Sequence, residues 1–153
     1  MEKSVESLLD KIQLTFELKP VKANLYSPLT LAYIGDAVYD LVIRTMLVEH
    51  GNAPVNKLHR KASSFVKAEA QARLIHLIED VLTEEEMAVY KRGRNAKSAT
   101  SAKNASVLDY RTATGFEALI GYLYLDNQMD RLLELVKTGF EKEKFTIDLN
   151  GKI

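Results

Sequence analysis

The chain of 153 residues has no cysteine and only three histidines, and these shortages exclude several kinds of site. Without cysteine there can be no disulfide framework and no thiolate metal centre, and the scattered histidines argue against a zinc site. Any catalytic metal must therefore be held by oxygen ligands. Carboxylate oxygens suit Mg²⁺, with Mn²⁺ as a substitute.

Turn-forming residues are also scarce, with seven glycines and three prolines. Long stretches without turn signals predict an all-α protein, and we expect residues 1–153 to form a single domain of about six main helices. No apolar run is long enough to span a bilayer, and the polar first ten residues lack a signal-peptide pattern. We therefore expect a cytoplasmic protein with no membrane partner.

Local signals place these helices along the chain. Ser27 followed by Pro28 is a good helix start, and Thr83 with Glu86 has the form of a capping box. Gly93 is expected to end the helix that begins after Thr83. The expected helices span about 4–16, 28–50, 54–80, 84–93, 109–125 and 129–144. Residues 93–108 are expected to form a polar loop, and the tail 145–153 is left open between a strand, a docked segment and a flexible end.

Two of the expected helices are apolar on nearly every side, and each holds an isolated acid in its apolar part. Asp36 lies in the middle of the segment 29–43, and Glu117 is the only charged residue between 113 and 125. An ionised carboxylate in such surroundings costs on the order of several kcal/mol unless it has a partner. If the helices cross, with Gly35 and Gly121 allowing close contact, the two carboxylates can share one divalent ion. A buried acid bonded to protein donors fits the same pattern, so the residues alone leave both interpretations open.

Two stretches resemble the motifs of a known family. Leu31-Ala-Tyr-Ile-Gly-Asp-Ala-Val38 resembles the signature of the ribonuclease III family, and Phe116-Glu-Ala-Leu-Ile-Gly-Tyr-Leu-Tyr-Leu-Asp126 resembles its second motif. The motifs occur in the family's order and, with residues 59–72 and 92–97, the resemblance covers most of the chain. Only 36 residues follow Glu117, too few for the RNA-binding domain of the full enzymes. The chain therefore resembles the Mini-III branch.

This resemblance implies a ribonuclease III-type endonuclease domain that cuts double-stranded RNA as a homodimer, with Mg²⁺ as its cofactor. It assigns Asp36 and Glu117 as catalytic residues and metal ligands. It also implies maturation of the 23S ribosomal RNA precursor, products with 5′-phosphate and 3′-hydroxyl ends, and a ribosomal protein as helper.

Two positions depart from the pattern of the full enzymes. Ala32 stands where they carry a Glu one turn before the signature Asp, and Thr114 where they carry an Asp three residues before the motif Glu. Half of the usual acidic cluster is missing, which favours weaker metal binding. It also keeps an alternative open, a non-catalytic RNA-binding, ribosome-associated protein of the same fold. A purely structural helical protein is a third interpretation.

The net charge is zero, but the charges are distributed unevenly. Residues 54–111 hold 11 Lys and Arg against 7 Asp and Glu, whereas both flanking parts are mildly acidic. Short polar residues lie between the basic ones, a mixture that suits RNA phosphates and 2′-hydroxyls. We expect RNA contacts from Lys91, Arg92, Arg94, Asn95, Lys97 and Lys103. A solvated polar loop is the alternative, and the motif pair favours RNA binding.

Overall fold

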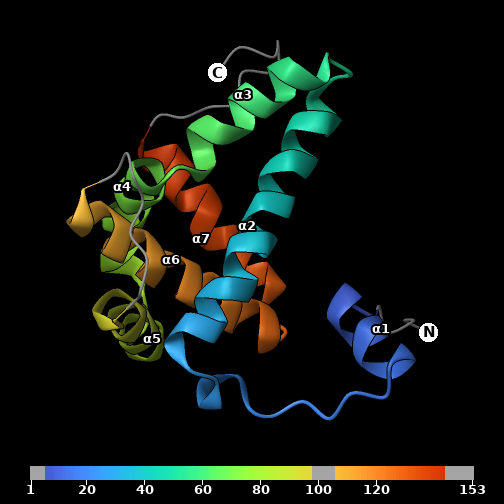
Figure 1. Ribbon diagram of the computed structural model, residues 1–153, viewed down its shortest axis with the longest axis vertical. Helices are drawn as coiled ribbons and strands as arrows, with labels where there is room; N and C mark the ends of the chain where they lie inside the picture. Colours follow the sequence, from blue (N-terminus) through green and yellow to red (C-terminus); the bar gives the residue numbers. More distant parts are fainter. Residues whose placement is uncertain (1–5, 98–105, 144–153) are drawn as a thin grey trace.

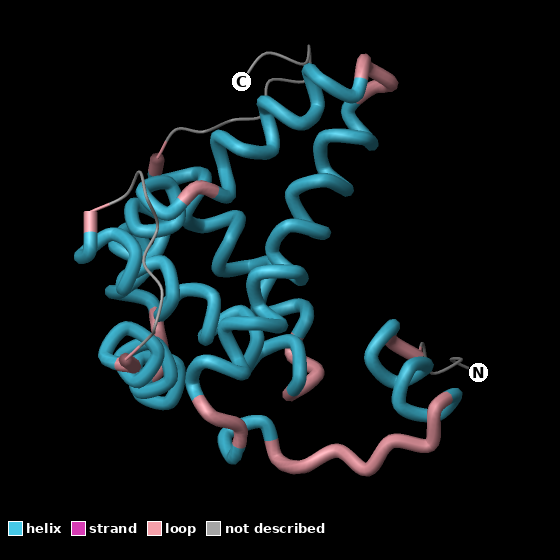
Figure 2. Tube along the Cα trace, viewed as in Figure 1, coloured by secondary structure: helices cyan, strands magenta, loops and turns pink. Residues whose placement is uncertain are grey.

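The computed structural model describes residues 6–97 and 106–143, and within these ranges all regular secondary structure is helical. This confirms the all-α prediction. The described chain forms seven α-helices, joined in places by single 3-10 turns at Ala23–Leu25 and Glu79–Val81 (Figures 1 and 2). The α-helices are α1 Leu8–Thr15, α2 Pro28–His50, α3 Val55–Val66, α4 Ala68–Ile78, α5 Glu84–Asn95, α6 Val107–Leu125 and α7 Met129–Lys142. None of these seven has the length and apolar character needed to cross a membrane.

Helix α6 lies at the centre, and α2, α4, α5 and α7 pack around it (Figure 1). Every residue of α6 from Thr112 to Leu123 is buried except Glu117, which is partly buried. The Tyr39 ring of α2 meets the Phe116 ring of α6 edge to face, with 5.0 Å between their centroids. Because other helices cover α6 on all sides, its buried part is apolar all round, and Glu117 is the one acid in that part.

Two glycines let α2 and α6 cross with their backbones in contact. A Cβ atom on Gly35 would overlap the backbone carbonyl of Glu117, and one on Gly121 would overlap the carbonyl of Leu31. No other residue type fits at these two points, because every other side chain begins with a Cβ atom. The predicted close approach is confirmed, and it occurs one residue away from Asp36.

The signals that start helices act largely as predicted. The Ser27 hydroxyl caps α2, and Thr83 and Glu86 form the capping box of α5, in which each side chain accepts a hydrogen bond from the other residue's N–H. The cap of α6 is the Ser106 hydroxyl, so this helix begins at Val107 rather than at 109.

Several other expected boundaries are wrong. The segment 54–80 is two helices, because the backbone turns to an extended conformation at Lys67 (φ −66°, ψ 153°). Helix α5 continues through Gly93, because the glycine lets α5 pack closely on Ala118 of α6 rather than ending the helix. The first helix begins at Leu8 rather than near Ser4. The expected loop 93–108 is shorter than predicted, because α5 continues to Asn95 and α6 begins at Val107. Residues 98–105 of that loop and the tail 145–153 lie outside the described residues.

Candidate active site

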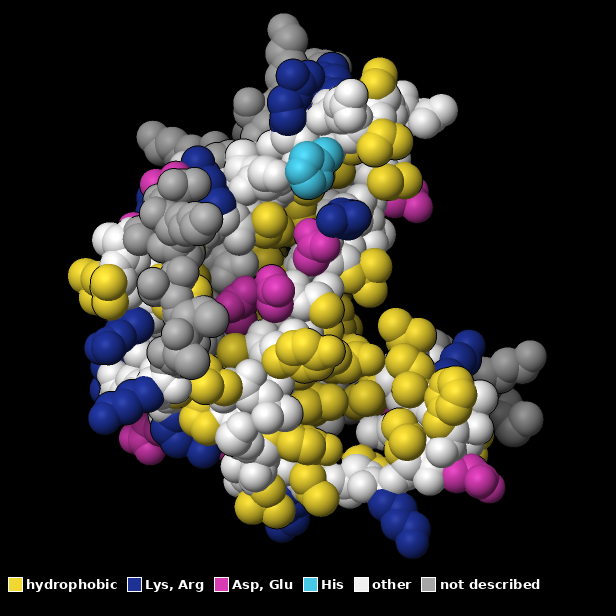
Figure 3. Space-filling model, in the orientation of Figure 1, with side chains coloured by type: hydrophobic (Ala, Val, Ile, Leu, Met, Phe, Trp, Pro, Cys, Tyr) yellow, Lys and Arg dark blue, Asp and Glu magenta, His cyan; other side chains and the backbone are white. Residues whose placement is uncertain are grey.

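Asp36 and Glu117 lie side by side where α2 crosses α6. The Glu117 carboxyl makes a side-chain hydrogen bond with Asp36, and the crossing glycine Gly35 precedes Asp36 in the chain. Asp36 is exposed to solvent, so the pair is open on one side. On the face drawn in Figure 3, acidic side chains gather in the middle, next to α2. The structure thus brings the two predicted carboxylates together, and their catalytic role stays a prediction.

The surroundings of Glu117 oppose its negative charge. Burial is the largest effect and the neighbouring Asp36 is the next, and together they raise the pKa of Glu117 to about 9. A hydrogen bond between two carboxyl groups needs a proton on one of them, so the pair holds a proton at neutral pH. A positive ion bound in the same place would lower the pKa of Glu117 and allow both carboxyl groups to be ionised.

The described residues around the pair add no further free carboxylate. Ala32, at the first missing acidic position, is buried in the core. Thr114, at the second, donates its hydroxyl to the Tyr110 carbonyl at 2.9 Å. Asp40, one turn after Asp36, is ion-paired with Arg44, whose Nε lies 2.9 Å from its carboxylate. Across the described ranges, no group of three or more His, Cys, Asp or Glu residues is arranged to hold a metal ion.

Two carboxylates are nevertheless a sufficient protein donor set for Mg²⁺. This ion keeps several waters and needs one or two carboxylates together with substrate phosphates. The raised pKa of Glu117 supports the fit, because it marks a place where the fold leaves negative charge uncompensated. Sequence analysis missed one residue of this site. Gln71 of α4 is 1% exposed and its side chain contacts Glu117.

The basic end of α5 lies beside the turn of α6 that carries Glu117. Gly93 packs against Gly115 and Ala118, which places its neighbours in α5 along the same part of α6. Figure 3 shows Lys and Arg side chains over α5. Four of the predicted RNA-binding residues in this part of the chain are exposed: Lys91, Arg92, Asn95 and Lys97. Arg94 instead lies over the Tyr90 ring, 5.4 Å from its centroid. Lys103 lies outside the described residues.

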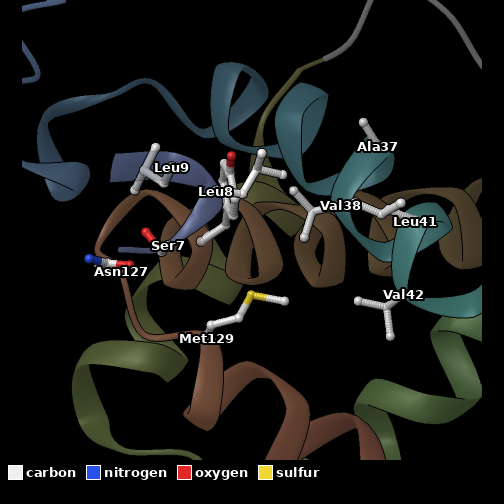
Figure 4. Close-up of a pocket in the computed structure, with 10 residues that line it drawn as sticks. Ser7, Leu8, Leu9, Ala37, Val38, Leu41, Val42, Asn127 and Met129 are labelled. Carbon is white, nitrogen blue, oxygen red and sulfur yellow. The ribbon is translucent and has the colours of Figure 1, made fainter. Parts of the chain in front are cut away.

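A separate apolar groove of about 230 Å³ runs between α1 and α2. Side chains of α1, α2 and the start of α7 surround it in Figure 4. Its lining is almost entirely apolar and includes Leu8, Val38, Leu41 and Met129. Such a lining suits burial against another apolar surface rather than phosphate chemistry.

Comparison with known proteins identifies the family. The ribonuclease III domain model matches residues 29–128. The Mini-ribonuclease 3 of Clostridium tetani is 59% identical over 112 residues, which cover 72% of this chain and 74% of the relative. The chain belongs to the Mini-ribonuclease 3 family. The Mini-ribonuclease 3 of a Thermoanaerobacter species is 48% identical over 141 residues, covering 92% of this chain and 97% of the relative.

The Mini-ribonuclease 3 assignment also agrees with a solved structure. The crystal structure of a Fusobacterium nucleatum protein superposes with a TM-score of 0.71 at 30% identity, covering 78% of this chain and 95% of the other. The ribonuclease III-type fold is therefore confirmed, and the chain is an endoribonuclease of the ribonuclease III type. The region matched by the family model contains Asp36, Glu117 and the basic end of α5.

Proposed function

We propose that this endoribonuclease hydrolyses double-stranded RNA with Mg²⁺ held by Asp36 and Glu117, Mn²⁺ being a substitute. The observation that carries the proposal is the carboxylate pair itself. Two acids share a hydrogen bond at the crossing of two core helices, and none of the described groups that act on the pKa of Glu117 is a cation. A divalent ion supplies the missing charge.

The chain's own residues would hold the ion and leave the reacting phosphate accessible. Bound Mg²⁺ activates water and neutralises charge on the phosphate. Asp36 faces solvent, where RNA arrives, while Glu117 anchors the pair in the core. Attack of water on phosphorus with loss of the 3′ oxygen leaves a 5′-phosphate and a 3′-hydroxyl.

RNA would be held mainly through its backbone. The exposed cations Lys91, Arg92 and Lys97 lie on α5 and just beyond it, close to the α6 turn that carries Glu117. Lys103 belongs to the same basic stretch in the sequence. Contacts to phosphates and 2′-hydroxyls recognise the shape of an A-form duplex rather than its base sequence.

The enzyme would act as a homodimer, so that two sites cut opposite strands. Helix α2 carries exposed apolar side chains at four-residue spacing, and Leu29, Tyr33 and Leu41 are 38%, 81% and 54% exposed. The groove between α1 and α2 continues this apolar surface at Leu41 (Figure 4). A self-complementary surface of this kind suits a twofold interface. The proposed setting is the cytoplasm, the substrate the 23S ribosomal RNA precursor, and the helper a ribosomal protein.

Cleavage of structured double-stranded RNA in Mg²⁺ or in chelator tests the proposal. Asp36→Asn should reduce cleavage by roughly 10²–10³-fold, because several kcal/mol of charge stabilisation is lost. Glu117→Gln should lose cleavage and keep RNA binding. Asp40→Asn is the matched control, one turn along the same helix and ion-paired, and should stay active. RNA binding without metal-dependent cleavage by the wild-type protein would support the non-catalytic alternative.

A salt titration tests the proposed RNA contacts. Replacing Arg92, Arg94 and Lys97 together by Gln should lower the slope of log affinity against log salt by up to about 3, since each lost phosphate contact removes about 1. The control triple, Lys11, Lys19 and Lys22 to Gln, removes the same number of positive charges from α1 and the segment between α1 and α2. Equal slopes for both triples would remove α5 from the interface.

A further inference from the structure

Gln71 is a buried polar residue in the first turn of α4, and its side chain reaches back to the end of α3. Its Nε2 donates to the Val66 carbonyl at 3.0 Å. That carbonyl needs a side-chain donor because the helical backbone is interrupted at Lys67. The N–H of Ala70, which would bond Val66 in a continuous helix, bonds the Lys67 carbonyl instead. The break therefore turns one end of the Gln71 amide toward Val66 and fixes which of its ends is nitrogen, because a carbonyl can only accept.

The same amide group also hydrogen-bonds with the active-site pair. Its hydrogen bond with the Glu117 carboxyl lowers the pKa of that group, as a donating N–H does, while the Oε1 atom of Gln71 is buried without a hydrogen-bond partner. A buried amide oxygen without a donor is unfavourable, and native proteins rarely keep one for stability alone. The side chain is thus clamped at one end, incompletely satisfied at the other, and next to the acid that carries the proposed chemistry.

We propose that Gln71 is a positioning residue whose amide, clamped on the Val66 carbonyl, holds the Glu117 carboxyl in the orientation that faces Asp36. A partly buried glutamate has several rotamers, and a ligand that must bind an ion together with Asp36 needs only one of them. Groups that orient a metal ligand typically change metal affinity or activity by about 10–100-fold when they are removed. The inference rests on the proposed function, because positioning matters only if Glu117 holds an ion.

Gln71→Met tests the inference, because methionine has nearly the same size and cannot hydrogen-bond through an amide. Two readouts are needed: Mn²⁺ affinity of the RNA-free protein by electron paramagnetic resonance, and kcat and KM for duplex cleavage. We expect Mn²⁺ affinity or kcat to fall about 10–100-fold with KM unchanged. Ile78→Val is the control, a buried change in the same helix two turns away, and should leave both readouts at wild-type values. Gln71→Asn, which shortens the side chain by one methylene, should show the same defect.

Different results would contradict the role of Gln71 and the proposed function. If Gln71→Met melts at a lower temperature while Mn²⁺ affinity and kcat equal those of the wild type, Gln71 is only a cap for α3 and the inference is wrong. A rise in KM alone would also overturn it, because that places Gln71 in RNA binding. Wild-type protein that neither binds Mn²⁺ nor cleaves would overturn the proposed function itself.

Discussion

Glu86 and Glu117 are both shielded acids on helices of the same core, and their surroundings move their pKa values in opposite directions. Glu86 is 4% exposed and receives two hydrogen bonds of 2.9 Å from the Arg131 guanidinium. Arg131 is the main reason that the pKa of Glu86 is lowered. Glu117 meets another carboxyl instead, and burial raises its pKa to about 9.

The difference distinguishes an acid whose charge is compensated inside the protein from one whose charge is not. Arg131 ties α7 to the first turn of α5, and it also donates to the Val81 carbonyl at 2.8 Å. The charge of Glu86 is therefore compensated inside the protein. Glu117 has no such partner among the described groups that act on it, so its compensation must come from a proton or from an added ion. Removing a charged group should therefore lower the stability of the protein at Arg131 and raise it at Glu117.

The largest expected effect is at the compensated site. Arg131→Met should lower the free energy of unfolding by about 3–5 kcal/mol, because it leaves Glu86 buried and unpaired. The pair of Arg73 and Glu143, whose side chains are 49% and 20% exposed, provides the control, and Arg73→Met should lower the free energy of unfolding by about 0–1 kcal/mol. Urea unfolding at pH 7 measures both. Similar losses in the two variants would mean that the burial of Glu86 does not matter.

At the uncompensated site, Glu117→Gln should increase stability in metal-free solution. The folded protein keeps a proton on Glu117 from the ordinary pKa of 4.5 up to about 9, while the unfolded chain has lost it. Wild-type stability attributable to this group therefore falls as pH rises through that window. The advantage of the variant should grow from near zero at pH 4.5 to at most about 5 kcal/mol at pH 8, since each pH unit in this window contributes up to about 1.4 kcal/mol.

Thermal unfolding at several pH values measures this advantage, at about 2–4 °C per kcal/mol for a chain of this size. Glu141→Gln, an exposed change in α7, should show no comparable pH-dependent gain. If Glu117→Gln is less stable than the wild type at every pH, the carboxyl is a satisfied structural group and the contrast with Glu86 fails.

Sequence reasoning found the uncompensated acid and missed the compensated one for a physical reason. Glu117 is the only charge between residues 113 and 125, and Gly35 and Gly121 indicated where α2 and α6 could meet. Glu86 follows two other glutamates at the exposed start of α5, and its partner Arg131 lies 45 residues further along the chain. A lone charge in an apolar stretch can be found in the sequence, whereas an ion pair between distant helices can be found only in the folded structure.

The same limit explains the errors at Lys67 and Gln71. No glycine or proline marks the break between α3 and α4, because the backbone turns at an ordinary lysine. Gln71 lies in the alanine-rich segment 68–72, where a glutamine usually faces water. Its burial follows from the break, since the freed Val66 carbonyl attracts its amide. Both features depend on packing that only the folded structure contains.

The smallest expected effect is the one that links the uncompensated site to its ion. Mg²⁺ at ten times its dissociation constant should stabilise the wild-type protein by about 1.4 kcal/mol, because it binds the folded state alone. The ion must displace the proton on Glu117, so its apparent affinity should rise as pH increases toward 9. Melting temperature against Mg²⁺ concentration at pH 6, 7 and 8 measures both effects.

Glu117→Gln should abolish the stabilisation and Glu141→Gln should retain it. Equal stabilisation of all three proteins would show that Mg²⁺ binds elsewhere, and the raised pKa of Glu117 would then reflect burial without function.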